Sequence, residues 1–401
     1  YWSYNLVADR VKEIGASPTM MVAAEAKKLK SEGVDVIDLS MGEPDFHTPN
    51  SIKAAGINAI EENRTRYTLN QGTNELRTAI SAKLKRDNNL DYNLNEIIVS
   101  SGAKQSVYNS ILATVNPGDE VIIPAPYWVS YPAMVSLAGG KNIIIETDEQ
   151  SGFKVTPEQL RSAVTSKTKM LILCNPSNPT GSAYTKKELE ALAEIVLKNN
   201  FYVLSDEIYE KLVYDDFQFV SFASLDPEIK KQTILVNGIS KTYAMTGWRI
   251  GYTAGPENIV SAINKIQSHT TSHASSISQH AAIEAVAGPQ YVIHEMLEEF
   301  RNRREYFYNE LTSIKGITCY KPEGAFYLFP NISKYLHTKS DVLKVENSFD
   351  FAMHLLYDAH IAAVPGSAFG SEGYLRMSYA TSMDHLHEAI FRLKKTLNKI
   401  H

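Results

Sequence analysis

In the middle of this chain, short apolar runs typical of buried strands alternate with segments of helical periodicity. The strand-like runs are 96–100, 120–124, 169–174, 201–205, 233–236 and 250–254, and helical segments include 102–115, 128–137 and 186–198. Because parallel strands need crossover connections, this order predicts an α/β fold with a mainly parallel sheet covered by helices on both faces. Ligands of such sheets bind beyond the carboxyl ends of the strands, so we expect functional residues there.

The pattern changes after Ala287. A long charged helical segment at 292–312 is followed by a Pro-Glu-Gly turn, short strand-like runs and a final helical segment at 384–400. Helices gathered around short strands are typical of an α+β domain. A length of 401 residues suits two domains, so we predict a second, smaller domain in the C-terminal part of the chain.

Composition narrows the kinds of ligand that this chain can bind. Its formal net charge of −5 gives no basic surface for nucleic acid, and no apolar run reaches the roughly 18 residues that cross a bilayer. Cys174 and Cys319 are the only cysteines, which excludes a disulfide framework and favours a reducing compartment. The N-terminus lacks a signal-peptide pattern. We therefore expect a cytoplasmic protein that binds small molecules, with neither nucleic acid nor a membrane as partner.

The segment Gly238–Gly251 carries the strongest chemical signal in the chain. Lys241 follows an apolar run, is flanked by Ser240, and precedes Arg249 in a Gly-x-Arg-x-Gly setting. A confined lysine can form a Schiff base with an aldehyde cofactor, and a hydroxyl and a guanidinium beside it can bind a phosphate. A surface lysine and a loop arginine are the alternative, but the glycines and apolar neighbours indicate a packed turn.

This segment resembles the cofactor-lysine signature of class I pyridoxal-phosphate-dependent aminotransferases, and the likeness runs through nearly the whole chain, nearest to bacterial-type aspartate aminotransferases. The resemblance implies fold type I, with a large domain at 46–290 and a small domain formed by both chain ends, 1–45 and 291–401. It implies that Lys241 binds pyridoxal 5′-phosphate. It also implies a ping-pong reaction that moves an amino group between aspartate or glutamate and 2-oxo acids.

The motif Ser205-Asp-Glu-Ile-Tyr209 ends a strand-like run. By the resemblance, Asp206 is the carboxylate that keeps the pyridine nitrogen of the cofactor protonated, and Tyr209 donates to the 3′-oxygen. A helix-capping aspartate and a packed tyrosine are the alternative interpretation. The presence of the lysine segment favours the catalytic interpretation over the structural one. Our candidate catalytic residues are therefore Lys241, Asp206 and Tyr209.

A strand gives way to a helix within Ser100–Gln105. Free amide groups and the positive end of a helix make such a place an anion site. A dianionic phosphate needs several donors, and we predict that the helix start and the lysine segment supply them together. The predicted phosphate-binding residues are Gly102, Ala103, Lys104, Ser240 and Arg249.

The segment Thr65–Gly72 resembles the family's loop whose tyrosine reaches the cofactor phosphate of the neighbouring subunit, and Tyr67 is that tyrosine. If Tyr67 acts across an interface, neither site is complete in a monomer. The resemblance therefore implies a C₂ homodimer with shared active sites.

Two further motifs concern the cofactor ring. Asn175–Gly181 is rich in proline and predicts a rigid turn with a cis peptide before Pro179. Asn178 matches the asparagine that binds the 3′-oxygen and the substrate carboxylate. Trp128 matches the aromatic residue that stacks on the ring and contacts the substrate, although a tryptophan of the core gives the same sequence signal.

The substrate α-carboxylate is assigned to Arg376, in Leu375–Tyr379, which matches the family arginine that pairs with it in bidentate fashion. The backbone of Gly42, in Ser40–Phe46, is expected to face the same carboxylate. An exposed, salt-bridging arginine is the alternative for Arg376.

Aspartate and glutamate carry a second carboxylate on the side chain, and binding it needs a cation besides Arg376. No arginine occurs in 267–279, where one branch of aspartate aminotransferases places it. The branch that this sequence resembles uses a lysine, here Lys104, and a partner loop that supplies Ser17 and Thr19. A lysine ammonium restricts the geometry of a bound carboxylate less than an arginine guanidinium does. We therefore expect dicarboxylates first, with aromatic amino acids or prephenate as rival substrates.

Other functions were weighed against this one. His269 and His273 have a spacing that suits a metal, but no third ligand motif accompanies them, so we predict no metal site. A lyase on the same fold is a second alternative, which ammonia release would distinguish from amino transfer. A non-catalytic regulator would need an added DNA-binding domain, for which the chain has neither the length nor a basic helix.

Overall fold

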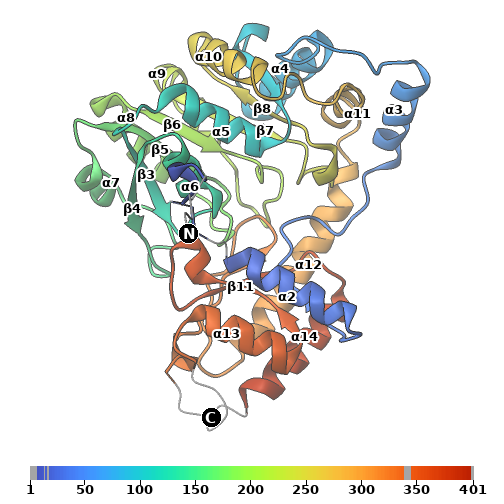
Figure 1. Cartoon of the computed structure of the whole chain (residues 1–401), viewed down its shortest axis with the longest axis vertical. Coiled ribbons are helices and arrows are strands. Elements are labelled where there is room, and N and C mark those ends of the chain that lie inside the picture. The colour runs from blue at the N-terminus through green and yellow to red at the C-terminus, as the bar shows by residue number, and fades with distance from the viewer. Residues whose placement is uncertain (1–6, 13, 16–17, 338–344, 399–401) are drawn as a thin grey trace, which may run out of the picture.

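The computed structural model describes residues 7–12, 14–15, 18–337 and 345–398. Within them, the largest element is a seven-stranded sheet in the order β2-β8-β7-β6-β5-β3-β4 (Figure 1). Its strands are β2 (Ile97–Ser100), β3 (Glu120–Ala125), β4 (Lys141–Glu146), β5 (Thr168–Cys174), β6 (Tyr202–Asp206), β7 (Thr233–Gly238) and β8 (Gly251–Ala254). Strand β8 runs antiparallel to β2 and β7, and the other neighbours are parallel. The predicted mainly parallel sheet is therefore confirmed.

Strand β4 was absent from the sequence prediction. It lies at the edge of the sheet, and along it only Ile145 is fully buried. An edge strand with one buried side chain carries little of the apolar signal by which the central strands are recognised. The other strands differ from the predicted ranges by one or two residues at their ends.

Side chains of the central strands alternate between two faces, and helices cover both. Met170 and Leu204 pack with one set of helices, whereas their neighbours Leu171 and Val203 pack with the other. The first set is α5 (Ala103–Thr114), α6 (Ser130–Leu137) and α10 (Glu257–Ser268); the second is α7 (Pro157–Ala163), α8 (Lys186–Asn199) and α9 (Pro227–Lys231). Burying each such side chain stabilises the fold by about 1.5–3 kcal/mol. Packing on both faces therefore holds the central strands, and with them the residues at their ends, in place.

Three more helices pack beside β2 and β8: α3 (Asn50–Glu61), α4 (Asn74–Asn88) and α11 (Ser276–Ala287). Ala281 and Ala282 of α11 are fully buried against them. Their small side chains let α11 approach α3 and α4 closely. The result is a helical layer at the upper right of the molecule in Figure 1.

The lower part of the molecule combines segments from both ends of the chain (Figure 1). Strand β1 (Ile37–Asp38) pairs in parallel with β10 (Ile361–Ala362), while β9 (Tyr327–Leu328), β11 (Val364–Pro365) and β12 (Leu375–Ser378) form an antiparallel sheet. The helices here are α2 (Pro18–Ser31), α13 (Ser348–His354) and α14 (Met383–Leu397), and α12 (Val292–Thr312) leads down to them from the upper part. This pairing agrees with a small domain built from both chain ends, whose bounds remain a prediction.

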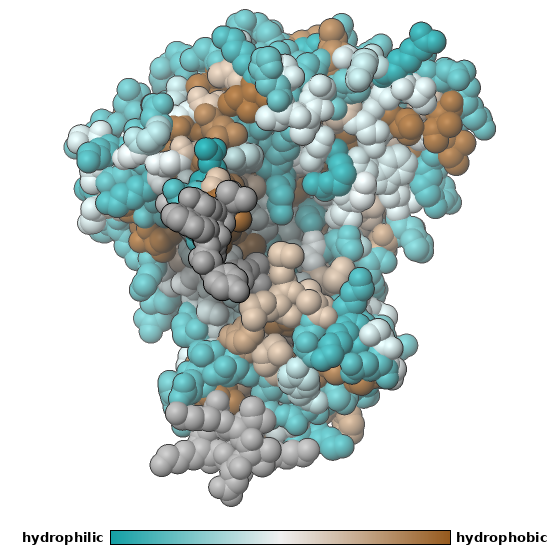
Figure 2. All heavy atoms as spheres, in the orientation of Figure 1, coloured by the Kyte–Doolittle hydropathy of each residue, from teal (hydrophilic) through white to brown (hydrophobic). Residues whose placement is uncertain are grey.

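Short elements complete the described chain. They are α1 (Asp9–Lys12), the 3₁₀ turns Leu94–Glu96, Phe222–Ser224, Thr246–Trp248, Ser333–Tyr335 and Gly366–Phe369, and a π-helical turn at Leu355–Ala359. None of the helices in the described residues is both long and apolar enough to cross a membrane. Figure 2 shows a hollow between the upper and lower parts of the molecule, with apolar atoms of α2 just below it.

Candidate active site

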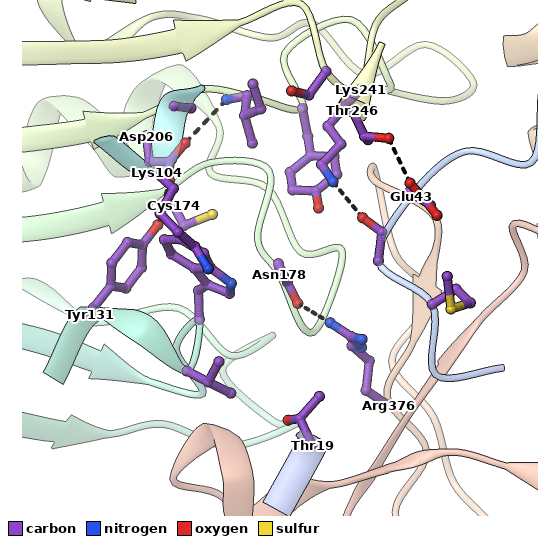
Figure 3. A pocket seen from close by; sticks show the side chains of 18 of the residues that line it. Thr19, Glu43, Lys104, Tyr131, Cys174, Asn178, Asp206, Lys241, Thr246 and Arg376 are labelled. Atoms are coloured by element: carbon purple, nitrogen blue, oxygen red, sulfur yellow. Dashed lines mark hydrogen bonds between the residues drawn. The ribbon is translucent and has the colours of Figure 1, made fainter. Parts of the chain in front are cut away.

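A cavity of about 460 Å³ opens at the carboxyl ends of β5 and β6, where the upper and lower parts meet (Figure 3). The predicted residues that line it are Gly42, Ala103, Lys104, Trp128, Asn178, Asp206, Tyr209, Ser240, Lys241, Arg249 and Arg376. Residues that line it without having been predicted are Ser40, Met41, Glu43, Val129, Tyr131, Cys174, Ile208, Thr246 and Phe369. The fold therefore brings almost every predicted site residue to one place.

Lys241 lies in the turn that follows β7. Its Nζ donates to the carbonyl oxygen of Gly42 and lies 6.0 Å from the centre of the Tyr209 ring. Burial, together with the charges of Arg376 and Arg249, lowers the pKa of this lysine to about 8 against the opposing charges of Glu43 and Asp206. A lysine with this pKa is partly neutral near physiological pH, so it can act as a nucleophile and as a base.

Asp206 ends β6 at the floor of the cavity, where only 5% of it is exposed. Its Oδ2 accepts a hydrogen bond of 2.7 Å from the hydroxyl of Tyr131. Burial raises the pKa of this carboxyl, while the Tyr131 hydroxyl and the charge of Lys241 oppose the rise. A buried carboxylate of this kind would gain from a protonated ring nitrogen placed against it.

Tyr131 is the clearest residue that the sequence analysis missed. It follows Trp128 by three residues, and the two rings meet edge to face at 5.2 Å. This i, i+3 spacing on the start of α6 is the signal that could have found it.

Arg376 is buried and faces the cavity from β12. Its Nη1 donates to Asn178 Oδ1 at 3.0 Å, and Nη2 donates to the Ser40 carbonyl at 2.7 Å. Its guanidinium lies over the ring of Tyr327 at 4.5 Å, and Nε has no partner in the described structure. Arg376 is only 5% exposed and its hydrogen bonds go to an amide and a backbone carbonyl among the described residues, so the alternative of an exposed salt bridge is wrong. A buried guanidinium without a counter-ion is suited to an incoming carboxylate.

Tyr209 and Asn178 line the same cavity as Asp206 and Arg376. The hydroxyl of Tyr209 is 2.8 Å from that of Tyr327, a residue of β9 that the sequence analysis did not single out. Asn178 follows β5 in the proline-rich turn, and the cis peptide predicted before Pro179 is present. The hydrogen bonds of Tyr209 with Tyr327 and of Asn178 with Arg376 orient both side chains.

The predicted phosphate site lies where α5 begins. Gly102 stands at the N-cap of α5 with φ of 83°, and a Cβ there would come within 2.2 Å of Arg249 Nη2. Gly251 is equally restricted, because its Cβ would come within 2.2 Å of the Ala103 amide. The two glycines thus let the guanidinium and β8 approach the helix start. There the first amide groups of α5 lack partners within the helix, which suits an anion.

Lys104 points across the cavity from the first turn of α5. Its Nζ lies 5.0 Å from the centre of the Trp128 ring. Burial lowers its pKa, and the nearby charge of Arg249 adds to the shift. Lys104 therefore brings a positive charge to the cavity, and no carboxylate of the described residues forms an ion pair with it.

Tyr67 and Thr19 were both predicted to act in the site of a neighbouring subunit. Tyr67 is 93% exposed, contacts His273 edge to face at 5.6 Å and is outside the cavity of its own chain. Thr19, which was assigned to a partner loop, lines the cavity of its own chain, so that assignment is wrong. The reason is that α2 begins at Pro18 and packs on the lower part through Val22. Ser17 lies outside the described residues.

No group of three or more metal-type ligands occurs in the described part of the chain. His269 follows the last turn of α10, and His273 Nδ1 lies 2.7 Å from the carbonyl of Ala274.

The residues in this cavity define a site for an aldehyde cofactor that carries a phosphate. They offer a lysine of lowered pKa, a buried carboxylate on the same cavity wall and an anion site at a helix start. The chain belongs to the family of class I and II aminotransferases, whose family model matches residues 34–393. The enzyme class and the use of pyridoxal phosphate predicted from the sequence are thereby confirmed.

Individual relatives cover nearly the full length of the chain. It is 47% identical to an aspartate aminotransferase of Bacillus sp. (strain YM-2), over 97% of this chain and 98% of the relative. It is 47% identical to an aspartate/prephenate aminotransferase of Nitrosomonas europaea, over 98% of this chain and 100% of the relative. A crystal structure of the aspartate aminotransferase from Rhizobium meliloti matches with a TM-score of 0.95 and 44% identity, covering 98% of this chain and 99% of that one. The predicted fold type is therefore confirmed.

Proposed function

We propose that this aminotransferase uses aspartate as its preferred amino donor and exchanges the amino group with 2-oxo acids, including 2-oxoglutarate. The observation that carries this proposal is the pair of cations at opposite ends of the cavity. Arg376 has no carboxylate partner in the described residues, and Lys104 points into the cavity from the other side. Two separated cations suit a substrate with two carboxylates.

Pyridoxal phosphate, when bound, supplies an aldehyde that condenses with amines and a ring that withdraws electrons from the substrate Cα. In our proposal, Asp206 and Tyr131 hold the ring nitrogen in its protonated form. Tyr209 and Asn178 bind the 3′-oxygen, and Trp128 covers the ring. Each of these side chains lines the cavity, and the Asp206–Tyr131 hydrogen bond fixes the carboxylate in advance.

The phosphate is proposed to bind at the start of α5. The donors are the amides of Ala103 and Lys104 and the side chains of Ser240 and Arg249. Gly102 lets the guanidinium of Arg249 approach. Several donors and a positive helix end together neutralise a dianion better than any one of them alone.

The proton transfer is assigned to Lys241. With the cofactor and a substrate bound, its neutral Nζ would take the proton from the substrate Cα. Burial and the charge of Arg376 favour the neutral form, as the lowered pKa of Lys241 indicates. Arg376, with Gly42 beside it, fixes the α-carboxylate and thereby the direction of the Cα–H bond.

Prephenate and aromatic amino acids are the second candidate substrates. Some relatives are aspartate/prephenate aminotransferases, and the cavity also has apolar walls formed by Met41, Val129 and Phe369. The similar Thermus thermophilus structure, 38% identical with a TM-score of 0.91 over 97% of this chain and 99% of that one, is an aspartate aminotransferase with maleate. Maleate is a dicarboxylate, which favours aspartate.

A substrate panel tests the proposal. Purified protein with pyridoxal phosphate is assayed with aspartate, glutamate, phenylalanine and tyrosine against 2-oxoglutarate, and with prephenate against aspartate or glutamate. We expect the highest kcat/KM for aspartate, and release of oxaloacetate without ammonia. A higher kcat/KM for prephenate or phenylalanine than for aspartate would show that aspartate is not the preferred substrate. Release of ammonia would indicate a lyase.

We also propose a homodimer in which Tyr67 completes the partner's site. Tyr67 is 93% exposed, and the apolar residues Ile57, Ile60 and Leu69 are each more than half exposed. Mixing two inactive variants tests this. A hybrid of Tyr67→Ala and Lys241→Ala subunits has one site with both residues intact, so co-refolding should restore activity. Failure to restore activity in verified hybrids would remove the shared site.

Two further assignments remain proposals. We propose the domain division at 46 and 290, with both chain ends in the small domain. We propose a cytoplasmic location because Cys174 and Cys319 are both unpaired.

A further inference from the structure

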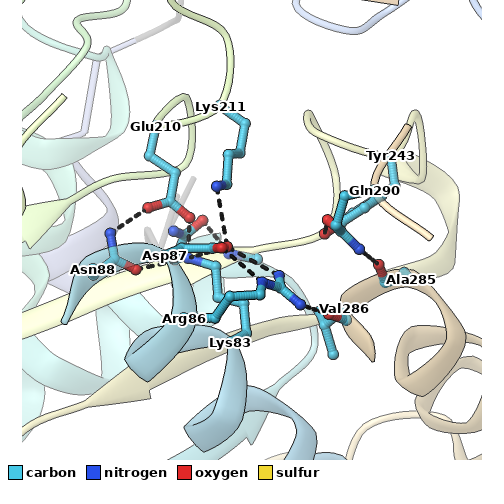
Figure 4. Close-up of polar contacts among 12 residues, drawn as sticks. Lys83, Arg86, Asp87, Asn88, Glu210, Lys211, Tyr243, Ala285, Val286 and Gln290 are labelled. Atoms are coloured by element: carbon cyan, nitrogen blue, oxygen red, sulfur yellow. Dashed lines mark hydrogen bonds and ion pairs between the residues drawn. The ribbon is translucent and has the colours of Figure 1, made fainter. Parts of the chain in front are cut away.

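The turn that follows β6 has two sides. Asp206 and Tyr209 line the cavity, whereas Glu210 points the other way, toward the end of α4 (Figure 4). There its carboxylate accepts hydrogen bonds from Lys83 Nζ and, at 2.8 Å, from Asn88 Nδ2. The side chains of Lys83 and Glu210 are only 5% and 4% exposed. A buried ion pair therefore lies directly behind the two proposed catalytic residues of this turn.

The turn that carries Lys241 is held from the same region. The hydroxyl of Tyr243 donates to Gln290 Oε1 at 2.7 Å. Gln290 Nε2 in turn donates to the carbonyls of Ala285 at 3.1 Å and Gly288 at 2.8 Å, which end α11. These hydrogen bonds connect the turn that carries Lys241 to the C-terminal end of α11 through the side chain of Tyr243, two residues beyond the lysine.

The ends of α4 and α11 are joined to each other. Arg86 Nη1 donates to the carbonyl of Val286 at 3.0 Å, and Arg86 Nε pairs with Asp87 at 2.7 Å. Asp87 also lies 3.1 Å from Lys211 Nζ and 3.9 Å from Lys83 Nζ. We call this group the α4–α11 corner: Lys83, Arg86, Asp87 and Asn88 of α4 and residues 285–290, together with Glu210 and Tyr243, which bind to them.

In the corner, neighbouring positive charges offset the effect of burial on the Asp87 carboxyl. Burial alone would raise the pKa of the Asp87 carboxyl, but Arg86, Lys83 and Lys211 together hold it below its ordinary value. Asp87 is therefore an anion surrounded by cations.

Stability does not account for such a cluster. Removing charges from water costs several kcal/mol for each ion, and replacing a buried pair with apolar side chains is often neutral or stabilising. Unlike apolar contacts, hydrogen bonds between charged groups form only at restricted distances and angles. The corner joins two turns that a proton-transfer site must hold to within about 0.5 Å.

We propose that the α4–α11 corner is a positioning device that sets the Asp206–Tyr209 turn and the Lys241 turn relative to each other, with Glu210 and Tyr243 as positioning residues for amino transfer. This inference rests on the proposed roles of Asp206, Tyr209 and Lys241. Glu210 acts one residue from Tyr209, and Tyr243 acts two residues from Lys241. Neither side chain lines the cavity in the described structure.

The test replaces the buried pair with apolar residues in the holoenzyme, as the double variant Lys83→Met with Glu210→Leu. We expect a thermal midpoint at or above that of the wild type, and kcat lowered about tenfold with KM changed less than twofold, because misplaced groups slow chemistry more than binding. The control makes the same substitutions at a partly exposed ion pair, as Lys394→Met with Glu310→Leu. This pair joins α14 to α12 at 2.6 Å and does not line the cavity.

A second readout separates positioning from folding. The pH midpoint at which the visible absorption of the bound cofactor changes reports the charges around Lys241 and Asp206. We expect it to shift by about 0.5 unit or more in the double variant and to stay unchanged in the control. A wild-type midpoint in the double variant would overturn the proposal, even with reduced stability or kcat. This titration needs no substrate, so an incorrect choice of amino donor would leave its outcome intact.

A milder variant covers the case in which the double variant does not fold. Tyr243→Phe removes one hydroxyl from the corner and leaves every charge in place. We expect about a threefold loss of kcat and a smaller midpoint shift in the same direction. Wild-type values for both kcat and the midpoint would overturn the proposal.

Discussion

The inner wall and the outer rim of the cavity differ in how firmly their side chains are held. On the inner wall, Asp206 and Arg376 are each 5% exposed and bonded to neighbouring protein groups. On the rim, Met41 is 42% exposed. Lys104, also at the rim, contacts only a ring face among its recorded side-chain partners. Under the proposed function, the groups that carry out the chemistry are held rigidly by the fold, whereas those that recognise the distal part of a substrate are free to adjust.

The largest effect is expected at the inner wall. Lys241→Ala removes the amine that is proposed to move the proton, so we expect transamination to fall at least about 10³-fold. Cofactor binding should persist, because the phosphate and ring contacts remain. The measurement is kcat with aspartate and 2-oxoglutarate, alongside equilibrium binding of pyridoxal phosphate. Turnover near that of the wild type would contradict the assignment of Lys241.

Arg376→Lys tests the second inner-wall group. It keeps a positive charge but loses the bidentate geometry and the bonds to Asn178 and Ser40. We expect kcat/KM to fall about 100-fold for every amino acid substrate, since all share the α-carboxylate. A loss confined to dicarboxylic substrates would instead place Arg376 at the distal end.

Much of the inner wall could be predicted because its residues lie in local motifs next to strands. Lys241, Asp206 and Asn178 each follow an apolar run that the sequence shows plainly. Likewise, α12 was predicted with its observed bounds, because 21 residues of charged helical periodicity leave few alternatives.

What the sequence could not provide depends on contacts between distant segments. Tyr327 lies 118 residues from Tyr209, whose hydroxyl it meets, and its strand is only two residues long. Thr19 was misplaced for the same reason, since no local pattern shows that α2 packs beneath the cavity of its own chain. The α4–α11 corner brings together charges more than 120 residues apart.

At the rim, Lys104→Ala sharpens the comparison by discriminating between substrates. We expect kcat/KM for aspartate to fall about tenfold, while the value for phenylalanine changes little, because only aspartate has a distal carboxylate. The ratio of the two constants is the measurement. Equal losses for both substrates would show that Lys104 serves the phosphate and not substrate choice.

The smallest effect is expected from Glu207, which lies behind the inner wall. Its Oε1 accepts from the hydroxyls of Ser205 and Ser221 at 2.8 and 2.9 Å, and burial, with the charge of Glu210, raises its pKa to about 8. The folded protein therefore keeps a proton that the unfolded chain releases near pH 4.5, so stability falls as pH rises between these values.

Glu207→Gln removes this dependence because glutamine does not ionise. We expect the thermal midpoint of the variant to fall less between pH 6 and pH 8.5 than that of the wild type, by about 1–3 °C. Parallel changes in the two proteins would show that Glu207 is not the group responsible.

The central claim is that one amine of the inner wall, Lys241 Nζ, holds the cofactor. Borohydride reduction of the holoenzyme fixes pyridoxal phosphate to whichever amine holds it, and peptide mapping by mass spectrometry then locates the label. The account predicts a single phosphopyridoxyl label on Lys241. A label on any other lysine, or no label on a protein that binds the cofactor, would contradict it.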